Sequence, residues 1–102
     1  MEKELKEKWV TALRSNTYTQ GTGQLYDPEK NKYCCLGILC QVADLKIDES
    51  GVRLINDEEK EDGYVGFYEV LGNKPLVETL WRLNDIEKLS FPEIADYIDK
   101  NL

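Results

Sequence analysis

Apolar residues near both ends of the chain recur at the spacing of amphipathic helices. In residues 1–15, Leu5, Trp9 and Leu13 fall on one face, and lysines and glutamates occupy the other. Residues 75–84 show the same pattern, with a proline in the first turn. Ser90 and Glu93 have capping-box spacing, which predicts a final helix from residue 91 onward.

The most apolar stretch of the chain, residues 34–45, predicts a buried central helix. Each residue of a helix advances by about 100°, so apolar side chains surround most of its axis. Only Gly37, Gln41 and Asp44 leave a narrow polar or small stripe. A helix of this kind is normally enclosed by the rest of its domain. Gly37 inside this helix indicates that another backbone or a ligand approaches closely there. Packing against another part of the chain is the commoner of these two reasons.

Turn-forming and β-favouring residues between these segments predict short β-hairpins. Leu25 and Tyr26 are expected to pair with Tyr33, because Asp-Pro at the start of the segment 27–32 opens turns. Residues 52–55 and 63–68 are predicted as two further strands, joined by a solvated acidic loop. The pattern therefore predicts a single α+β domain over residues 1–102, with about four helices.

Charge and cysteine content restrict the partners and the compartment. The chain has 13 basic and 20 acidic residues, no histidine and a net charge of -7. This balance opposes binding to nucleic acid or to an anionic membrane, because both are polyanions. The first nine residues lack the apolar core of a signal peptide, and no stretch approaches ~20 uninterrupted apolar residues. A cytoplasmic protein with three free thiols is expected.

The three cysteines are predicted to be packing residues of the central helix. Cys34, Cys35 and Cys40 would project at about 0°, 100° and 240° around its axis, so they cannot converge on one metal ion. No histidine is available to complete a zinc site. We therefore predict no metal, no cofactor and no catalytic residue. A thiol-dependent enzyme acting through Cys34 or Cys35 stays as an alternative, since a helix N-terminus can lower a thiol pKa.

Two surfaces are candidates for binding. The first is the densest group of hydrogen-bonding side chains, which surrounds two glycines and offers an arginine for an anion and a tyrosine for stacking. It comprises Arg14, Ser15, Tyr18, Gln20, Gly21, Thr22 and Gly23. The second is an acidic run that could meet a basic partner. It comprises Asp57, Glu58, Glu59, Glu61 and Asp62.

Several short blocks along the chain form a recognisable set. They are Trp9, Ala12-Leu13-Arg14-Ser15, Tyr18, Gln20-Gly21-x-Gly23-x-Leu25, Tyr33-Cys34-Cys35-Leu36-Gly37-x-Leu39-Cys40, Leu83-Asn84-Asp85 and Ser90-Phe91-x-Glu93-Ile94-Ala95-Asp96. With these blocks the chain resembles a family of small uncharacterised bacteriophage and prophage proteins. The resemblance implies a phage accessory protein expressed in the cytoplasm of the bacterial host, and it transfers no functional residue.

By analogy, small acidic phage proteins without a catalytic motif often act by binding a host component. The leading hypothesis is a noncatalytic binding protein that inhibits host antiviral defence, either by sequestering a nucleotide signal or by blocking a defence protein. The alternatives are an acidic nucleic-acid mimic that inhibits a basic host protein, and the thiol-dependent enzyme. The expected partner is a host defence protein or a small nucleotide, with no direct nucleic acid and no membrane. Oligomerisation is left open.

Overall fold

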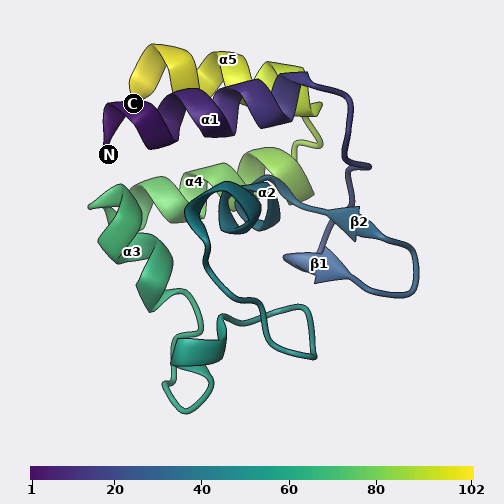
Figure 1. The fold of residues 1–102 in the computed structure, drawn as a ribbon, viewed down its shortest axis with the longest axis vertical. Helices are drawn as coiled ribbons and strands as arrows, with labels where there is room; N and C mark the ends of the chain where they lie inside the picture. The colour runs from purple at the N-terminus through teal and green to yellow at the C-terminus, as the bar shows by residue number, and fades with distance from the viewer.

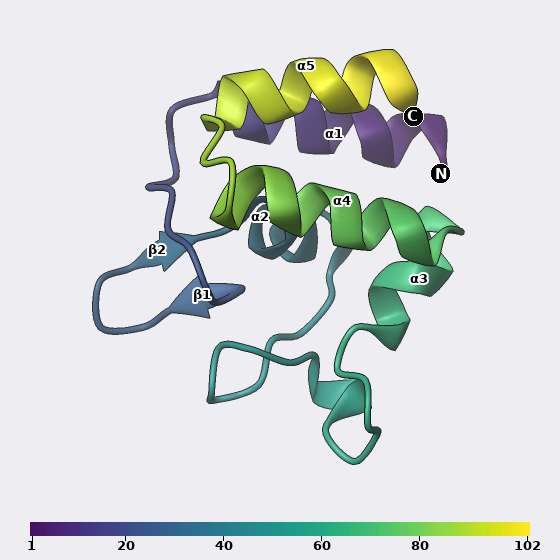
Figure 2. The same ribbon diagram turned by 180° about the vertical axis from the view of Figure 1, so that it is seen from behind.

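The computed structural model describes all residues, 1–102, and contains five α-helices and one β-hairpin. The elements are α1 (Lys3–Arg14), β1 (Tyr26–Asp27), β2 (Lys32–Tyr33), α2 (Cys35–Ala43), a 3-10 turn (Ile55–Asp57), α3 (Val65–Leu71), α4 (Lys74–Asp85) and α5 (Phe91–Asn101). Helices α1 and α5 lie side by side over α4 and α2, and the hairpin projects from one side (Figures 1 and 2). The predicted α+β class is confirmed.

Helix α2 forms the centre of the core, as its apolar pattern predicts. All residues from Cys35 to Cys40 are buried, and the helix ends before Asp44, which adopts the left-handed conformation at φ 55°. Trp9 of α1 is also fully buried, and its indole N–H donates to the Cys35 carbonyl at 3.0 Å. Burying one large apolar side chain stabilises the fold by about 1.5–3 kcal/mol, so packing around α2 holds the domain together.

Gly37 lets the central helix touch the backbone that leads into β1. A Cβ atom at this position would lie 1.9 Å from the Leu25 carbonyl oxygen. The same oxygen accepts a hydrogen bond from the Cys34 N–H at 3.3 Å. The expected close approach is therefore made by another part of the chain. It fixes the hairpin, in which Tyr26 pairs with Tyr33 as predicted.

The prediction of two strands at residues 52–55 and 63–68 is wrong. Leu54 makes only an isolated bridge with Ile47, and the 3-10 turn follows it. Residues 65–71 form α3, which buries Phe67 and Leu71 four positions apart and ends at Gly72 with φ 71°. The tyrosine, valine and phenylalanine of this segment favour strands, but the helical spacing of its two core residues decides the structure. The helix count rises from about four to five.

The two C-terminal helices begin with side-chain caps. Asn73 Oδ1 accepts the Leu76 N–H at 3.1 Å at the start of α4. Ser90 and Glu93 form both halves of the predicted capping box at the start of α5. Because α5 returns antiparallel to α1, the two chain ends lie together, at the end of the molecule opposite the hairpin (Figures 1 and 2). No helix is both long enough and apolar enough to span a membrane.

Candidate functional site

A buried asparagine organises the region where the ligand site was predicted. Asn84 is fully buried in α4, and its side-chain oxygen accepts from Gln20 Nε2 at 2.9 Å and from the Cys35 N–H at 3.2 Å. Its amide nitrogen donates to the Gly21 carbonyl at 2.9 Å and to Asp85 Oδ1 at 2.7 Å. Asn84 was not among the predicted site residues. Its helical spacing from buried Val77 and Leu80 was the available signal.

The Gln20 side chain is fully engaged inside the protein. Besides its bond to Asn84, its Nε2 donates to the Leu89 carbonyl at 2.7 Å, and its Oε1 accepts the Phe91 N–H at 3.1 Å. These contacts fasten the segment after α1 to the loop between α4 and α5. Gln20 therefore positions the predicted site, and its amide is not free for a ligand.

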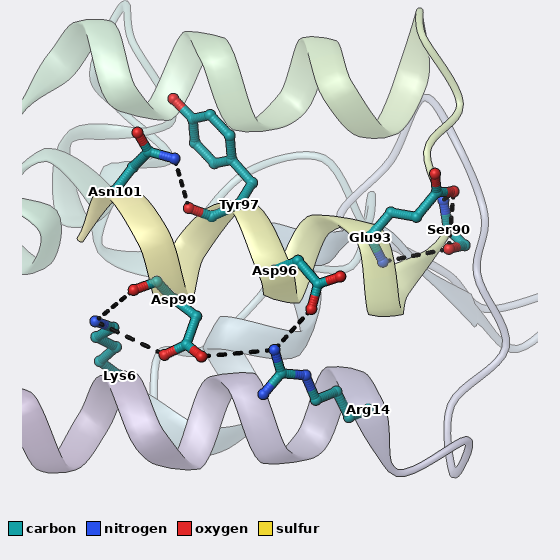
Figure 3. Close-up of polar contacts among 8 residues, drawn as sticks. All are labelled: Lys6, Arg14, Ser90, Glu93, Asp96, Tyr97, Asp99 and Asn101. Atoms are coloured by element: carbon teal, nitrogen blue, oxygen red, sulfur yellow. Dashed lines mark hydrogen bonds and ion pairs between the residues drawn. The ribbon is translucent and has the colours of Figure 1, made fainter.

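Arg14, predicted as the anion contact, faces two carboxylates of α5. Its Nη2 donates to Asp96 Oδ1 at 2.7 Å and lies 3.6 Å from Asp99 Oδ2 (Figure 3). The hydrogen bond to Asp96 raises the pKa of the Arg14 guanidinium above its ordinary value. Ser15, the next predicted site residue, donates its hydroxyl to the Ala12 carbonyl at 2.7 Å. Both side chains thus have partners within the protein.

The predicted ligand site is divided between separate hollows. One hollow of about 470 Å³ is lined by Leu13, Arg14, Asn16, Tyr18, Thr19, Gln20, Ser90, Phe91 and Pro92. Another of about 210 Å³, which we call the hairpin hollow, is lined by Gln20, Gly21, Thr22, Gln24, Asp27, Lys30 and Lys32. Ser15 and Gly23 line neither. The seven residues therefore do not form one pocket.

Three half-buried tyrosines form a row across the hairpin, and we call Tyr18, Tyr33 and Tyr26 the tyrosine row. The rings of Tyr18 and Tyr33 meet edge to face, with centroids 5.3 Å apart, and those of Tyr33 and Tyr26 lie 4.6 Å apart. Burial raises the pKa of the central tyrosine, Tyr33. Side chains alternate along a strand, so Asp27 and Lys32 lie on the opposite face of the hairpin. Tyr18 is thus separated from the hairpin hollow.

A hollow of about 400 Å³ adjoins the tyrosine row, and we call it the row hollow. Five of its eight lining residues are hydrophobic. They are joined by Gln41 and by Lys46, whose ammonium group lies 3.4 Å from Asp44. The full lining is Tyr26, Tyr33, Cys40, Gln41, Asp44, Leu45, Lys46 and Ile47. Apolar and aromatic walls with a few polar groups are typical of binding sites.

Two of the five residues in the predicted acidic surface are engaged within the protein: Asp57 is buried, and Asp62 is partly exposed. Asp57 is only 2% exposed and accepts from the Gly66 N–H and from Lys60 Nζ, both at 2.9 Å. Burial alone would raise its pKa, but these hydrogen bonds and the Lys60 charge lower it overall. Asp62 accepts from the Tyr68 hydroxyl at 2.5 Å, which lowers the Asp62 pKa. The exposed part of the predicted surface is Glu58, Glu59 and Glu61.

The three thiols are free and buried within the core. Burial raises the pKa of Cys34 and of Cys40 to about 12, and it also raises that of Cys35. The thiolate is the nucleophilic form of cysteine, so this environment disfavours a thiol-dependent reaction. No group of three or more histidine, cysteine, aspartate or glutamate side chains is arranged to hold a metal ion.

Comparison with known proteins identifies one relationship. The family model described as Domain of unknown function (DUF8296) matches residues 1–81. The match includes α1, the hairpin, α2, α3 and the larger part of α4, whereas Asn84 and α5 lie beyond it. Comparison with curated proteins and with solved structures gives no significant match. Because the match covers most of its length, the chain belongs to the DUF8296 family.

Proposed function

We propose that the protein is a noncatalytic phage protein that blocks a host defence protein, using the tyrosine row and the row hollow as its contact surface. The observation that supports this proposal is the tyrosine row itself. Tyr26 does not pack against the core, yet its ring packs against Tyr33 in a tilted arrangement, at the edge of a hollow lined by both hydrophobic and polar residues. Tyrosines presented in this way are characteristic of protein interfaces.

The contacts of the predicted ligand site favour a protein partner over a nucleotide signal at that place. Arg14 is already paired with two aspartates, and the Gln20 amide is saturated. Tyr18 lines a different hollow from Gly21 and Thr22, so the predicted residues do not converge on one nucleotide-sized pocket. A partner protein needs only to place one apolar or aromatic side chain in the row hollow, with polar groups facing Gln41 and Lys46.

The proposed setting, a phage-infected bacterial cell, rests on sequence resemblance. The blocks around Trp9, Tyr18 to Leu25 and Tyr33 to Cys40 support it, and all of them lie within the matched family region. The structure gives several of these residues a role in shaping one surface. Gly37 admits the β1 backbone, and the Tyr33 ring lies beside Gly37. The resemblance and the proposed contact surface therefore share Tyr18, Tyr33 and Cys40.

The proposal is tested by quantitative affinity capture from infected cells with matched variants. Tyr26→Ala should weaken the retained complex about 30-fold, as truncation of an interface hot spot of about 2 kcal/mol does. Tyr26→Phe keeps the stacked ring and should retain the partner. Ile86→Ala is the control, because Ile86 is 62% exposed and belongs neither to the tyrosine row nor to the lining of the row hollow.

The same capture distinguishes the tyrosine row from the acidic surface. If a partner is retained by Tyr26→Ala but lost when Glu58, Glu59 and Glu61 are all changed to glutamine, the tyrosine proposal is wrong. Strong weakening of that complex by salt would then favour the nucleic-acid mimic, because exposed charges are screened within about 10 Å at 0.1 M salt. If neither set of variants affects capture or phage growth, both proposals fail.

A further inference from the structure

The hairpin hollow differs in chemistry from the row hollow on the opposite face of the hairpin. None of its seven lining residues is hydrophobic. Two are lysines, and the others supply amide, hydroxyl and backbone groups around a glycine, with one carboxylate. In a chain with a net charge of -7, a polar hollow that contains two lysines is an unusual local environment.

The lysine charges of the hairpin hollow are available to a ligand. Neither Lys30 nor Lys32 forms an ion pair, whereas Arg14 and Lys46 at the other two hollows are each paired with a carboxylate. The carboxylate of the hairpin hollow, Asp27, is used within the turn. Its Oδ1 accepts the Glu29 N–H at 3.0 Å and the Lys30 N–H at 3.2 Å.

The turn beside these lysines presents backbone donors without acceptors. The Gly21 N–H donates to the Tyr33 carbonyl, and the Leu25 N–H donates to the Gly51 carbonyl, each at 2.7 Å. The three N–H groups between them, in residues 22–24, have no hydrogen-bond acceptor within the protein. Gly23 adopts the left-handed conformation at φ 82°. Successive N–H groups around a left-handed residue form a concavity that binds anions.

One lysine is held beside this turn by close packing. A Cβ atom on Gly21 would lie 2.8 Å from Lys32 Cβ, so the Lys32 side chain rests against the glycine backbone. The Gly21 carbonyl is in turn fixed by the amide of buried Asn84 at 2.9 Å. The turn and Lys32 are therefore placed together before any ligand arrives, which lowers the entropic cost of binding.

We propose that the hairpin hollow binds the phosphate group of a small anion, through Lys30, Lys32 and the free N–H groups of Thr22 and Gln24, which line the hollow on either side of Gly23. Ammonium and backbone N–H donors are the groups that recognise phosphate oxygens in proteins. The site is independent of the tyrosine row. Free phosphate and a phosphorylated nucleotide share this chemistry, and the overall negative charge of the protein makes binding weak and sensitive to salt.

The test is a titration of the full-length protein with inorganic phosphate, followed by backbone amide NMR at low ionic strength. The amide signals of Thr22, Gly23 and Gln24 should shift in a saturable way. The double variant Lys30→Gln/Lys32→Gln should weaken binding at least about tenfold, and Lys30→Arg/Lys32→Arg should keep it. The control Lys3→Gln/Lys100→Gln removes the same charge from exposed lysines without ion pairs and should stay within about twofold of the original.

A second variant separates the turn from the charge. Gly23→Ala keeps both lysines but strains a left-handed position, so it should also weaken phosphate binding. Thermal unfolding of this variant checks that it is still folded. Adenosine monophosphate should bind at least as well as phosphate, and adenosine should not shift these amides. Shifts that never saturate, equal losses in the control double variant, or binding of adenosine alone would each overturn the proposal.

Discussion

Replacing Gly37 with alanine tests whether the central helix and the β1 backbone touch as the structure describes. The position is an informative one because two effects oppose each other. Helix propensity alone favours alanine over glycine by roughly 1 kcal/mol. The added Cβ atom would instead lie 1.9 Å from the Leu25 carbonyl oxygen and 2.9 Å from its carbon, and neither atom belongs to a flexible side chain.

The expected loss of stability in Gly37→Ala follows from the displacement of the Leu25 carbonyl by the added Cβ atom. Forcing an extra carbon into a filled core costs about 1–3 kcal/mol. Displacing the Leu25 carbonyl also weakens its hydrogen bond with the Cys34 N–H, which contributes about 1 kcal/mol. After the propensity gain is subtracted, Gly37→Ala should destabilise the protein by about 1–3 kcal/mol. A central value of about 2 kcal/mol lowers Tm by roughly 8–16 °C in a domain of about this size.

Urea unfolding and thermal unfolding, both followed by circular dichroism, measure this loss. Gly66→Ala in α3 is the matched control, because its Cβ atom would meet the end of the flexible Leu54 side chain. The control should change the free energy of unfolding by less than about 1 kcal/mol, since propensity and a small side-chain shift nearly cancel. If Gly37→Ala is as stable as the original chain, or more stable, the gain in helix propensity exceeds any steric cost. The close contact between Gly37 and the Leu25 carbonyl would then be refuted.

Two further predictions concern buried groups. Asn84→Ala leaves the Gln20 amide and the Cys35 N–H without their shared acceptor. Each unsatisfied group costs about 1–3 kcal/mol, so the free energy of unfolding measured in denaturant should fall by about 3 kcal/mol or more. A loss below about 1 kcal/mol would contradict the hydrogen-bond network around Asn84. The pKa of the Cys34 and Cys40 thiols is raised from about 9 to about 12 on folding. The stability they contribute is therefore complete below pH 9 and is lost as the pH rises toward 12, because only the unfolded chain releases these protons there. Native protein should also react slowly with iodoacetamide at pH 8, and rapid reaction before unfolding would refute their burial.

Local patterns explain which parts of the fold were predictable. The end helices have amphipathic spacing, the final helix has its capping box, and the hairpin has an Asp-Pro turn, so short stretches of sequence specify each of them. Helix α3 was missed because the segment before Leu71 is too short for its period to outweigh its β-favouring residues. The outcome there depends on burial of Phe67, which is a property of the whole fold.

The candidate site was harder to predict because its contacts join residues that are distant in the sequence. Arg14 was expected to meet an anion, but its partner Asp96 lies 82 positions away. Gln20 reaches Asn84 across 64 positions, and that contact removes its amide from the surface. Tyr18, Tyr26 and Tyr33 come from three segments. The paired strands bring Tyr26 beside Tyr33, and a bridge between Gln20 and Tyr33 brings Tyr18 to the same row. Residue type indicates that this region is rich in hydrogen-bonding groups, but it could not show which of these groups already have partners within the protein.

The antiparallel return of α5 along α1 has a practical consequence for how the molecule can be held. Both chain ends leave the domain on the side away from the hairpin (Figures 1 and 2). An affinity tag, a fluorescent protein or a tether to a sensor surface can therefore be attached at either end without covering either face of the hairpin. Neighbouring ends also suit circular permutation, so a short linker could join them while the hairpin stays in place as the free tip of the molecule.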